Sequence, residues 1–208
     1  MISSSQQQWI TRNSVLNNGW SNGVWNQVFV GVTGAPTQNF PPSAANGNPY
    51  TTIATSPVTR EKPFLYVDGD DKFNVFVPAL QKNSSGVTWA NGPAAGSSIP
   101  ISDFYIAKPT DSAAVINLAL AFGKNLVLTP GVYKLDQPLH VLWPNTVVLG
   151  LGFPTLVPTR GNAAMDVANV PGVKLSGHPA HRACLGCCPL LERKTSPYHA
   201  CFRSIARN

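Results

Sequence analysis

The apolar segments in the C-terminal half of this chain are short, end abruptly and then resume. Residues 125 to 152 read NLVLTPGVYKLDQPLHVLWPNTVVLGLG, where Pro, Gly or Asn separates β-branched runs. No helical period links these runs, and β-branched residues favour strands. Similar segments begin at residues 125, 146 and 172, at intervals of 21 and 26 residues. Short strands repeated every 20–30 residues or so are typical of a solenoid. The sequence therefore predicts a mainly β fold, a right-handed parallel β-helix with Gly150, Gly152 and Gly177 at its corners.

Composition agrees with a turn-rich β protein. Charged residues make up 12% of the chain, and there are 17 Gly and 19 Pro. Helical proteins usually carry more Lys and Glu on their exposed faces. No apolar run approaches the length that spans a bilayer, so no membrane partner is expected. The first residues, MISSSQQQW, lack the charged and apolar regions of a signal peptide.

Residues 1–104 are predicted to form an N-terminal β-rich region. The segment VWNQVFVGVTGAP alternates as a strand does and ends at a Gly-Ala-Pro turn. Aromatic and β-branched runs at 64–67 and 73–77 flank Asp68-Gly69-Asp70-Asp71. This pattern predicts a hairpin in which Gly69 supplies the positive φ of the turn.

Residues 105–177 are predicted to contain one capping helix and the first coils of the β-helix. Thr110 or Asp111 can cap the helix, and Gly123 lies where a left-handed residue ends it. Its apolar residues fall on two faces, Val115, Leu118, Ala119 and Phe122 on one and Ile116 and Leu120 on the other. We therefore expect the helix to be sandwiched between other elements.

The segment TDSAAVINLALAFGKNLVLTPGVYKLDQPLHV, followed by NTVVLGLGFPTLVP, resembles the start of the pectate-lyase-like right-handed parallel β-helix superfamily. The shared pattern is an Asp-initiated helix, an apolar strand, Pro-Gly-x-Tyr and a strand ending Gly-x-Gly. Members include family-55 exo-β-1,3-glucanases and relatives of family-87 α-1,3-glucanases, secreted proteins that discoidin-type carbohydrate-binding modules often accompany. The resemblance implies a carbohydrate-active protein that hydrolyses an extracellular, glucan-like polysaccharide. The alternative is a non-catalytic β-helix module that binds glycan or is structural.

The resemblance also implies that the sequence is an N-terminal fragment. Family members have many more coils, and their catalytic carboxylates usually lie on later coils. This chain is therefore expected to lack a complete active site and the signal peptide of a secreted protein. Neither the sugar, the linkage nor the oligomeric state follows from the sequence.

The last 31 residues differ in composition from the rest. Residues 178–208 carry five Lys/Arg and one Glu, against ten Lys/Arg and eight Asp/Glu in residues 1–177, and they hold all four Cys. Cys184 and Cys187 have a metal-ligand spacing, but the remaining Cys and His spacings match no common zinc finger. No metal or other cofactor is therefore expected. Without interleaved aromatic residues, no specific nucleic-acid binding is expected either. This tail is predicted to be disordered or read out of frame.

Glycoside hydrolysis needs two carboxyl groups about 5–10 Å apart. The Asp residues of the predicted hairpin turn and Asp111 have structural explanations, as turn residues and helix cap. Asp136 and Asp166 lie in predicted coils, where they could project onto a groove or be solvated corner residues. No pair has a persuasive spacing, so the catalytic residues are not identified.

Two further side chains are candidates for sugar binding. His140 alternates with Leu139 and Val141, so its side chain is expected to point outward, although one exposed His is weak evidence for acid–base chemistry. Trp143 precedes Pro144 at a predicted corner. Its indole could stack on a pyranose ring or belong to the core. The substrate-binding candidates are therefore Asp136, His140, Trp143 and Asp166.

Overall fold

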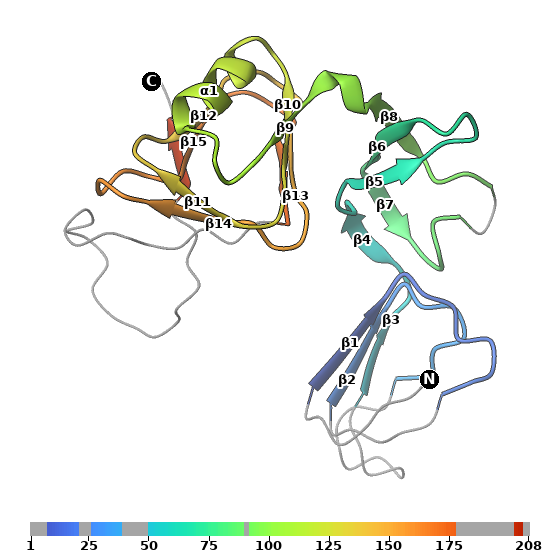
Figure 1. Cartoon of the computed structure of the whole chain (residues 1–208). Helices are drawn as coiled ribbons and strands as arrows, with labels where there is room; N and C mark the ends of the chain where they lie inside the picture. The colour runs from blue at the N-terminus through green and yellow to red at the C-terminus, as the bar shows by residue number, and fades with distance from the viewer. Residues whose placement is uncertain (1–7, 21–25, 39–49, 90–91, 178–201, 206–208) are drawn as a thin grey trace. The chain divides into compact units, whose positions relative to one another are not determined.

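The computed structural model describes residues 8–20, 26–38, 50–89, 92–177 and 202–205. The described part is mainly β with a single α-helix, which confirms the predicted fold class (Figure 1). Its elements are β1 Gln8–Arg12, β2 Asn26–Val30, β3 Tyr50–Ile53, β4 Ser56–Thr59, β5 Phe64–Val67, β6 Phe73–Pro78, β7 Gln81–Ser84, β8 Gly96–Pro100, the 3-10 turn Ile101–Asp103, β9 Phe104–Ala107, α1 Ala113–Ala121, β10 Asn125–Leu128, β11 Val132–Leu135, β12 Leu139–Val141, β13 Val147–Gly150, β14 Thr155–Pro158, β15 Met165–Ala168, β16 Lys174–Ser176 and β17 Phe202–Ile205.

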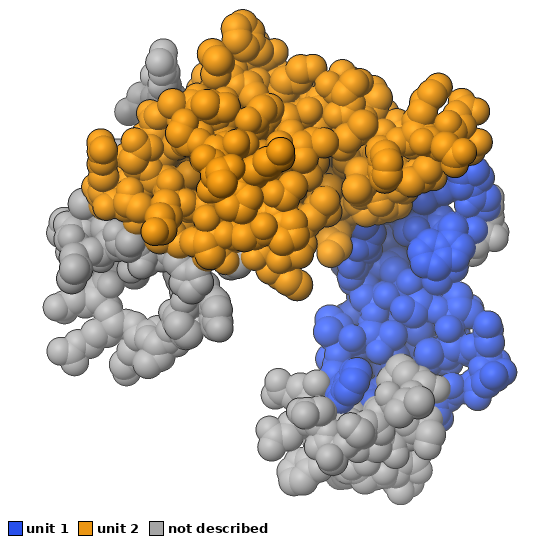
Figure 2. Space-filling view, viewed as in Figure 1, with its two compact units in different colours: residues 1–61, 78–97 blue, residues 62–77, 98–208 orange. Residues whose placement is uncertain are grey.

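The chain forms two compact units (Figure 2). The first comprises Met1–Glu61 and Pro78–Ser97, and the second comprises Lys62–Val77 and Ser98–Asn208. The segment between the two halves of the first unit therefore contributes a hairpin to the second. The division of the chain into regions 1–104, 105–177 and 178–208 stays a prediction.

The second unit contains the predicted coils. Three parallel sheets run along it, with strand orders β16-β13-β10-β9, β11-β14 and β12-β15-β17. Leu126 pairs with Val148, and Val148 pairs with Leu175, so the three similar sequence segments lie on successive coils. The predicted stacking of parallel strands is confirmed.

The first rung of the solenoid was missed in the sequence. Strand β9 pairs in parallel with β10, with Phe104 opposite Asn125 and Ala107 opposite Leu128. Phe104 and Asn125 are 21 residues apart, the same interval as between the segments at 125 and 146, but α1 lies within this interval and β9 has only four residues. A short strand before a helix gives little periodic signal.

Tyr133, from the Pro-Gly-x-Tyr segment, joins two coils in the core. Its side chain is fully buried, and its hydroxyl lies 2.8 Å from the Ala107 carbonyl oxygen and 3.0 Å from that of Thr129. The Thr129 backbone N–H also donates to Ala107, at 3.1 Å. Burial raises the pKa of the Tyr133 phenol. The surrounding buried core consists of Ala107, Ala113, Ile116, Leu120, Leu126, Leu128, Leu135, Leu139, Val141, Val148, Leu156, Ala164 and Met165.

Two glycines meet where consecutive coils turn the same corner. A Cβ on Gly150 would lie 2.7 Å from the carbonyl carbon of Gly177, and one on Gly177 would lie 3.1 Å from that of Gly150. Backbone therefore contacts backbone directly between the coils. Gly150, Gly152 and Gly177 lie where the chain leaves a strand, as predicted. Close approach explains Gly150, whereas Gly152 and Gly177 also have a positive φ, of 64° and 79°.

The helix begins one or two residues later than expected. Ser112 is its N-cap, and its side-chain oxygen accepts a hydrogen bond from the Val115 backbone N–H at 3.3 Å. The prediction of Thr110 or Asp111 as cap was wrong. The Asp111 carboxylate instead accepts from the Lys108 backbone N–H at 2.9 Å and the Tyr105 hydroxyl at 3.0 Å. Desolvation, reinforced by this carboxylate, raises the pKa of Tyr105.

Only one apolar face of α1 packs in the described structure. Ile116 and Leu120 are buried against the coils, while Val115, Leu118 and Phe122 are exposed by 47%, 60% and 78%. The prediction of a sandwiched helix was therefore wrong. Gly123 ends the helix with φ 79°, as expected. At nine residues, α1 is far too short to cross a bilayer, and no described helix qualifies as a membrane span.

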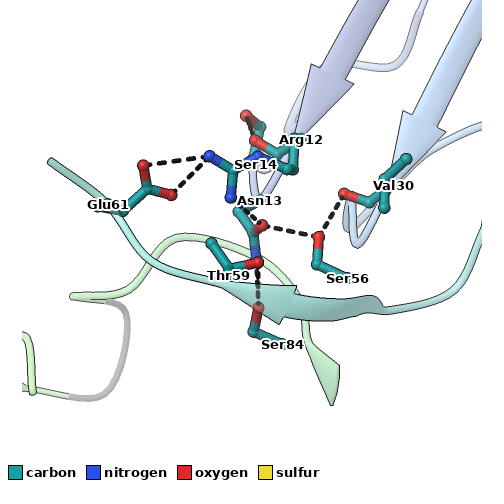
Figure 3. Close-up of polar contacts among 8 residues, drawn as sticks. All are labelled: Arg12, Asn13, Ser14, Val30, Ser56, Thr59, Glu61 and Ser84. Atoms are coloured by element: carbon teal, nitrogen blue, oxygen red, sulfur yellow. Dashed lines mark hydrogen bonds and ion pairs between the residues drawn. The ribbon is translucent and has the colours of Figure 1, made fainter. Parts of the chain in front are cut away.

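The first unit holds a second, smaller parallel stack, which the sequence did not reveal. Strands β1, β2 and β3 pair in parallel in that order, with a core of Phe29, Val32 and Tyr50. Strands β4 and β7 pair antiparallel beside a polar network (Figure 3). In it, Asn13 accepts from the Ser56 hydroxyl at 2.8 Å and donates to the Ser84 hydroxyl at 2.9 Å.

The hairpin of β5 and β6 is confirmed, but its turn differs from the prediction. Val67 pairs with Phe73, and the residue with positive φ is Asp71, at 60°, not Gly69. Asp tolerates the left-handed conformation better than most residues because its short side chain bonds locally.

Asp68 holds this turn with its carboxylate. It accepts from the backbone N–H of Asp70 at 2.9 Å and of Lys72 at 3.0 Å, and from the Asn74 side-chain amide at 2.6 Å. The hydrogen bond from Lys72 is the main cause that lowers the pKa of Asp68. This carboxylate therefore has a structural use in the turn.

Candidate functional site

The structure brings together two of the four candidate residues. His140 lies on β12 and Asp166 on β15, and the two are direct partners in the parallel register. His140 Nδ1 is 3.8 Å from Asp166 Oδ2, and their side chains are 43% and 18% exposed. Residues opposite each other on adjacent parallel strands point to the same face, so the pair follows directly from the stacking of coils.

The backbone around His140 is held by the helix. Leu139 and Val141 are fully buried, so His140 points outward as predicted. The Asn117 side chain, from α1, accepts from the His140 backbone N–H and donates to the Pro138 carbonyl, both at 2.8 Å. One amide therefore fixes the start of β12 against α1.

Asp166 has an oxygen that lacks a partner. Its Oδ1 is buried and forms no hydrogen bond within the described part of the chain. A buried acceptor left unpaired usually costs about 1–3 kcal/mol, and such atoms need an explanation. Strand β17 pairs with β15 and places Arg203 at the register position beside Asp166. That strand lies within the segment predicted to be a disordered tail.

Trp143 and Asp136 form no hydrogen bond or ion pair with the His140–Asp166 pair in the described structure. Trp143 is half-exposed, and its indole N–H donates to the Ala121 carbonyl at the end of α1, at 3.0 Å. Its polar group is therefore used within the fold, and half of its surface stays accessible for stacking. Asp136 is exposed in the turn before β12 and forms no hydrogen bond or ion pair with the other described residues.

The described site is an imidazole and one carboxylate. These groups can form hydrogen bonds with sugar hydroxyls, but hydrolysis requires two carboxyl groups across the scissile bond. Asp68 and Asp111 are already engaged in turns. Among the described residues, no three His, Cys, Asp or Glu side chains gather to hold a metal ion. Cys184 and Cys187, the residues of the zinc hypothesis, lie outside the described residues.

An aromatic cluster on β5 and β6 was missed in the sequence. Phe64 and Phe76 are opposite each other in the hairpin, with ring centroids 5.4 Å apart. The Tyr66 ring lies 6.3 Å from Phe64 and 6.5 Å from Phe76. We call these three residues the aromatic platform. Only the hairpin register combined with the alternation along β5 would have shown that the rings share a face.

Comparison with known proteins gives a family match, a related enzyme and related solved structures. Residues 104–184 match the family described as the LAM55 pectate lyase-like domain. An exo-beta-1,3-glucanase of Streptomyces sp. (strain SirexAA-E / ActE) is 52% identical over 173 residues, which cover 83% of this chain and 27% of that protein. This chain therefore spans less than a third of the relative's length.

Solved structures agree with the sequence match. The structure of sacteLam55A from Streptomyces sp. SirexAA-E has a TM-score of 0.77 at 50% identity, covering 84% of this chain and 31% of that one. A variant of the same protein in complex with glucose has a TM-score of 0.76, also at 50% identity, over 84% of this chain and 30% of that one. The resemblance to pectate-lyase-like β-helix glucanases is confirmed.

Proposed function

Because residues 104–184 match the LAM55 pectate lyase-like domain, we propose that this chain is the N-terminal part of an extracellular glucan hydrolase. The observation that carries the proposal is the 52% identity to an exo-beta-1,3-glucanase over 83% of the chain. The match is longer than the β-helix domain alone and so extends into the N-terminal region. We infer a β-1,3-linked glucan as the polysaccharide partner, because the relative is named for that linkage.

The 208-residue chain by itself is not expected to hydrolyse glucan. An acid and a base or nucleophile must flank the glycosidic bond, and the candidate site supplies one carboxylate, Asp166. We infer that the missing groups belong to coils beyond those described. A discoidin-type module also stays a prediction from the resemblance.

A chimera tests this proposal directly. The matching 173 residues of the Streptomyces exo-beta-1,3-glucanase are replaced by those of this chain, and glucose release from a soluble β-1,3-glucan is measured. We expect kcat/KM within about tenfold of the parent enzyme, since the interface with the catalytic part is then largely kept. The isolated 208-residue chain is expected to release no glucose.

A folded but inactive chimera would contradict the proposal. Folding is checked by cooperative urea unfolding and a monodisperse sedimentation profile. If such a chimera still binds β-1,3-glucan without releasing glucose, the alternative of a non-catalytic glycan-binding or structural module is favoured.

We further propose that His140 and Asp166 contact the bound glucan, with Trp143 as an additional stacking surface. In the chimera, H140A and D166N are each expected to raise KM by about tenfold, with little change in kcat, because one hydrogen bond to the glucan is lost in ground and transition states alike. Asp103→Asn is the matched control, since the Asp103 side chain is exposed and its carboxylate has no partner among the described residues. An unchanged KM in both variants would show that the pair only joins adjacent coils.

A further inference from the structure

The sheet of β5, β6 and β8 has one face packed and one face open. Val75 and Val77 are buried in a cluster with Phe104, Val127, Val147 and Leu149, and Leu65 and Ile99 pack against it. Because side chains alternate across a strand, the aromatic platform lies on the opposite face. Its rings are therefore not part of this core. Phe64 remains 47% exposed, although burying such a ring is favourable by roughly 2 kcal/mol.

The polar groups beside the platform are hydroxyls and an amide. The Tyr66 hydroxyl lies 2.7 Å from the Ser98 hydroxyl, on β8. Asn74, the register partner of Tyr66, donates its side-chain amide to Asp68 and presents an uncharged side chain to the same face. The three rings, these hydroxyls and this amide form a mixed apolar and hydrogen-bonding surface.

The charge of this face limits its partners. Its strand residues Phe64, Tyr66, Asn74, Phe76 and Ser98 are all uncharged, and the carboxylate at its end, Asp68, is engaged in the turn. Nucleic acids and anionic membranes are bound chiefly through Lys and Arg, which these strand positions do not provide. A neutral partner with apolar faces and many hydroxyls complements this surface, and a glucan has these properties.

We propose that the aromatic platform is a binding site for a neutral β-glucan chain, separate from the His140–Asp166 pair. The apolar face of a pyranose stacks on Phe64, while sugar hydroxyls exchange hydrogen bonds with Tyr66 and Ser98. The choice of a β-1,3-linked glucan rests on the proposed function; the chemical class rests on the platform itself.

The geometry of the rings supports binding without much reorganisation. Tyr66 meets Phe64 and Phe76 edge-on, with interplanar angles of 62° and 81°. Edge-to-face contacts between aromatic rings are favourable and directional, so each ring restricts its neighbours. A surface whose side chains are already ordered loses less conformational entropy when a ligand binds.

Binding of the complete 208-residue chain to laminarin, a soluble β-1,3-glucan, tests the proposal by calorimetry or affinity electrophoresis. Phe64→Ala and Tyr66→Ala are each expected to weaken binding by about three- to tenfold, the usual scale of an aromatic contact. Phe64→Leu keeps apolar volume but removes the ring face, and it is expected to weaken binding similarly while the chain stays folded. Phe122→Ala is the matched control, because Phe122, the C-cap of α1, is 78% exposed and has no ring contact among the described residues.

Three results would overturn the proposal. Unchanged laminarin binding with a lowered unfolding temperature would show that the rings only stabilise the hairpin as a cross-strand pair. Equal weakening by Phe122→Ala would show nonspecific adhesion. Binding to RNA or to anionic vesicles, but not to laminarin, would indicate a partner of another class.

The laminarin-binding test of the platform and the activity test of the chimera can fail independently of each other. An active chimera together with a 208-residue chain that does not bind laminarin would refute the platform and leave the proposed function intact. Laminarin binding that depends on Phe64, together with a folded inactive chimera, would support the platform and refute the hydrolase.

Discussion

Replacing Tyr133 by alanine is expected to destabilise the β-helix unit by about 3–5 kcal/mol, the usual loss for a large buried aromatic residue. The ring is fully buried between coils, so its removal leaves a cavity among Leu, Ile and Ala side chains. The replacement also removes the hydrogen bond from the Tyr133 hydroxyl to the Ala107 carbonyl oxygen, which is 2.8 Å long. A loss of this size is a large fraction of the stability of a typical domain, about 5–15 kcal/mol.

Two matched variants separate the parts of this effect. Tyr133→Phe keeps the ring and removes the hydroxyl, and it is expected to cost about 1 kcal/mol, because Ala107 still accepts from Thr129. Val132→Ala changes a neighbour that is 53% exposed, and it is expected to cost under about 0.5 kcal/mol. Urea unfolding followed by circular dichroism measures all three. If Tyr133→Ala were no more costly than Val132→Ala, Tyr133 would not be a core residue.

The repeating part of the fold was predictable because it is repetitive. The segments near residues 125, 146 and 172 pair in register, and His140 points outward, as alternation in β12 requires. The pairing of His140 with Asp166 could also have been inferred, had the register between coils been known. Parallel stacking places residues that are one coil apart in the sequence beside each other. Because the coils here differ in length, counting residues from His140 does not identify its partner.

The other features of the fold could not be predicted because they depend on contacts between segments that are distant in the sequence. Strands β1 and β3 carry polar residues and few periodic apolar ones, and the stack that they form with β2 is joined to β4 and β7 through side chains such as Asn13 and Ser84. The exposed face of α1 was misjudged because apolar residues alone do not show whether a partner is present. The same limit applied to Phe64, whose exposure depends on which face of the hairpin meets the coils.

Gly150→Ala is expected to destabilise the same unit by about 3 kcal/mol, at the upper end of the range for overpacking. The new methyl group would lie 2.7 Å from the Gly177 carbonyl carbon and 2.9 Å from the Pro154 side chain. The main obstacle is backbone, so no rotamer change relieves it. Gly150 does not have a positive φ, so the expected loss of unfolding free energy would come from this contact and not from backbone strain.

Gly69→Ala is the matched control for Gly150→Ala. Gly69 also has no positive φ, and nothing lies within 4 Å of the position that its new methyl group would take, so its replacement is expected to be neutral or slightly stabilising. Urea unfolding gives the two free energies, and hydrogen exchange in β13 and β16 locates the loss. Equal stabilities for the two variants would mean that the coils at residues 150 and 177 are not in direct contact. Because a solenoid is stabilised by each coil packing on the next, protection in β16 is expected to fall more than protection in β9, at the other edge of the sheet.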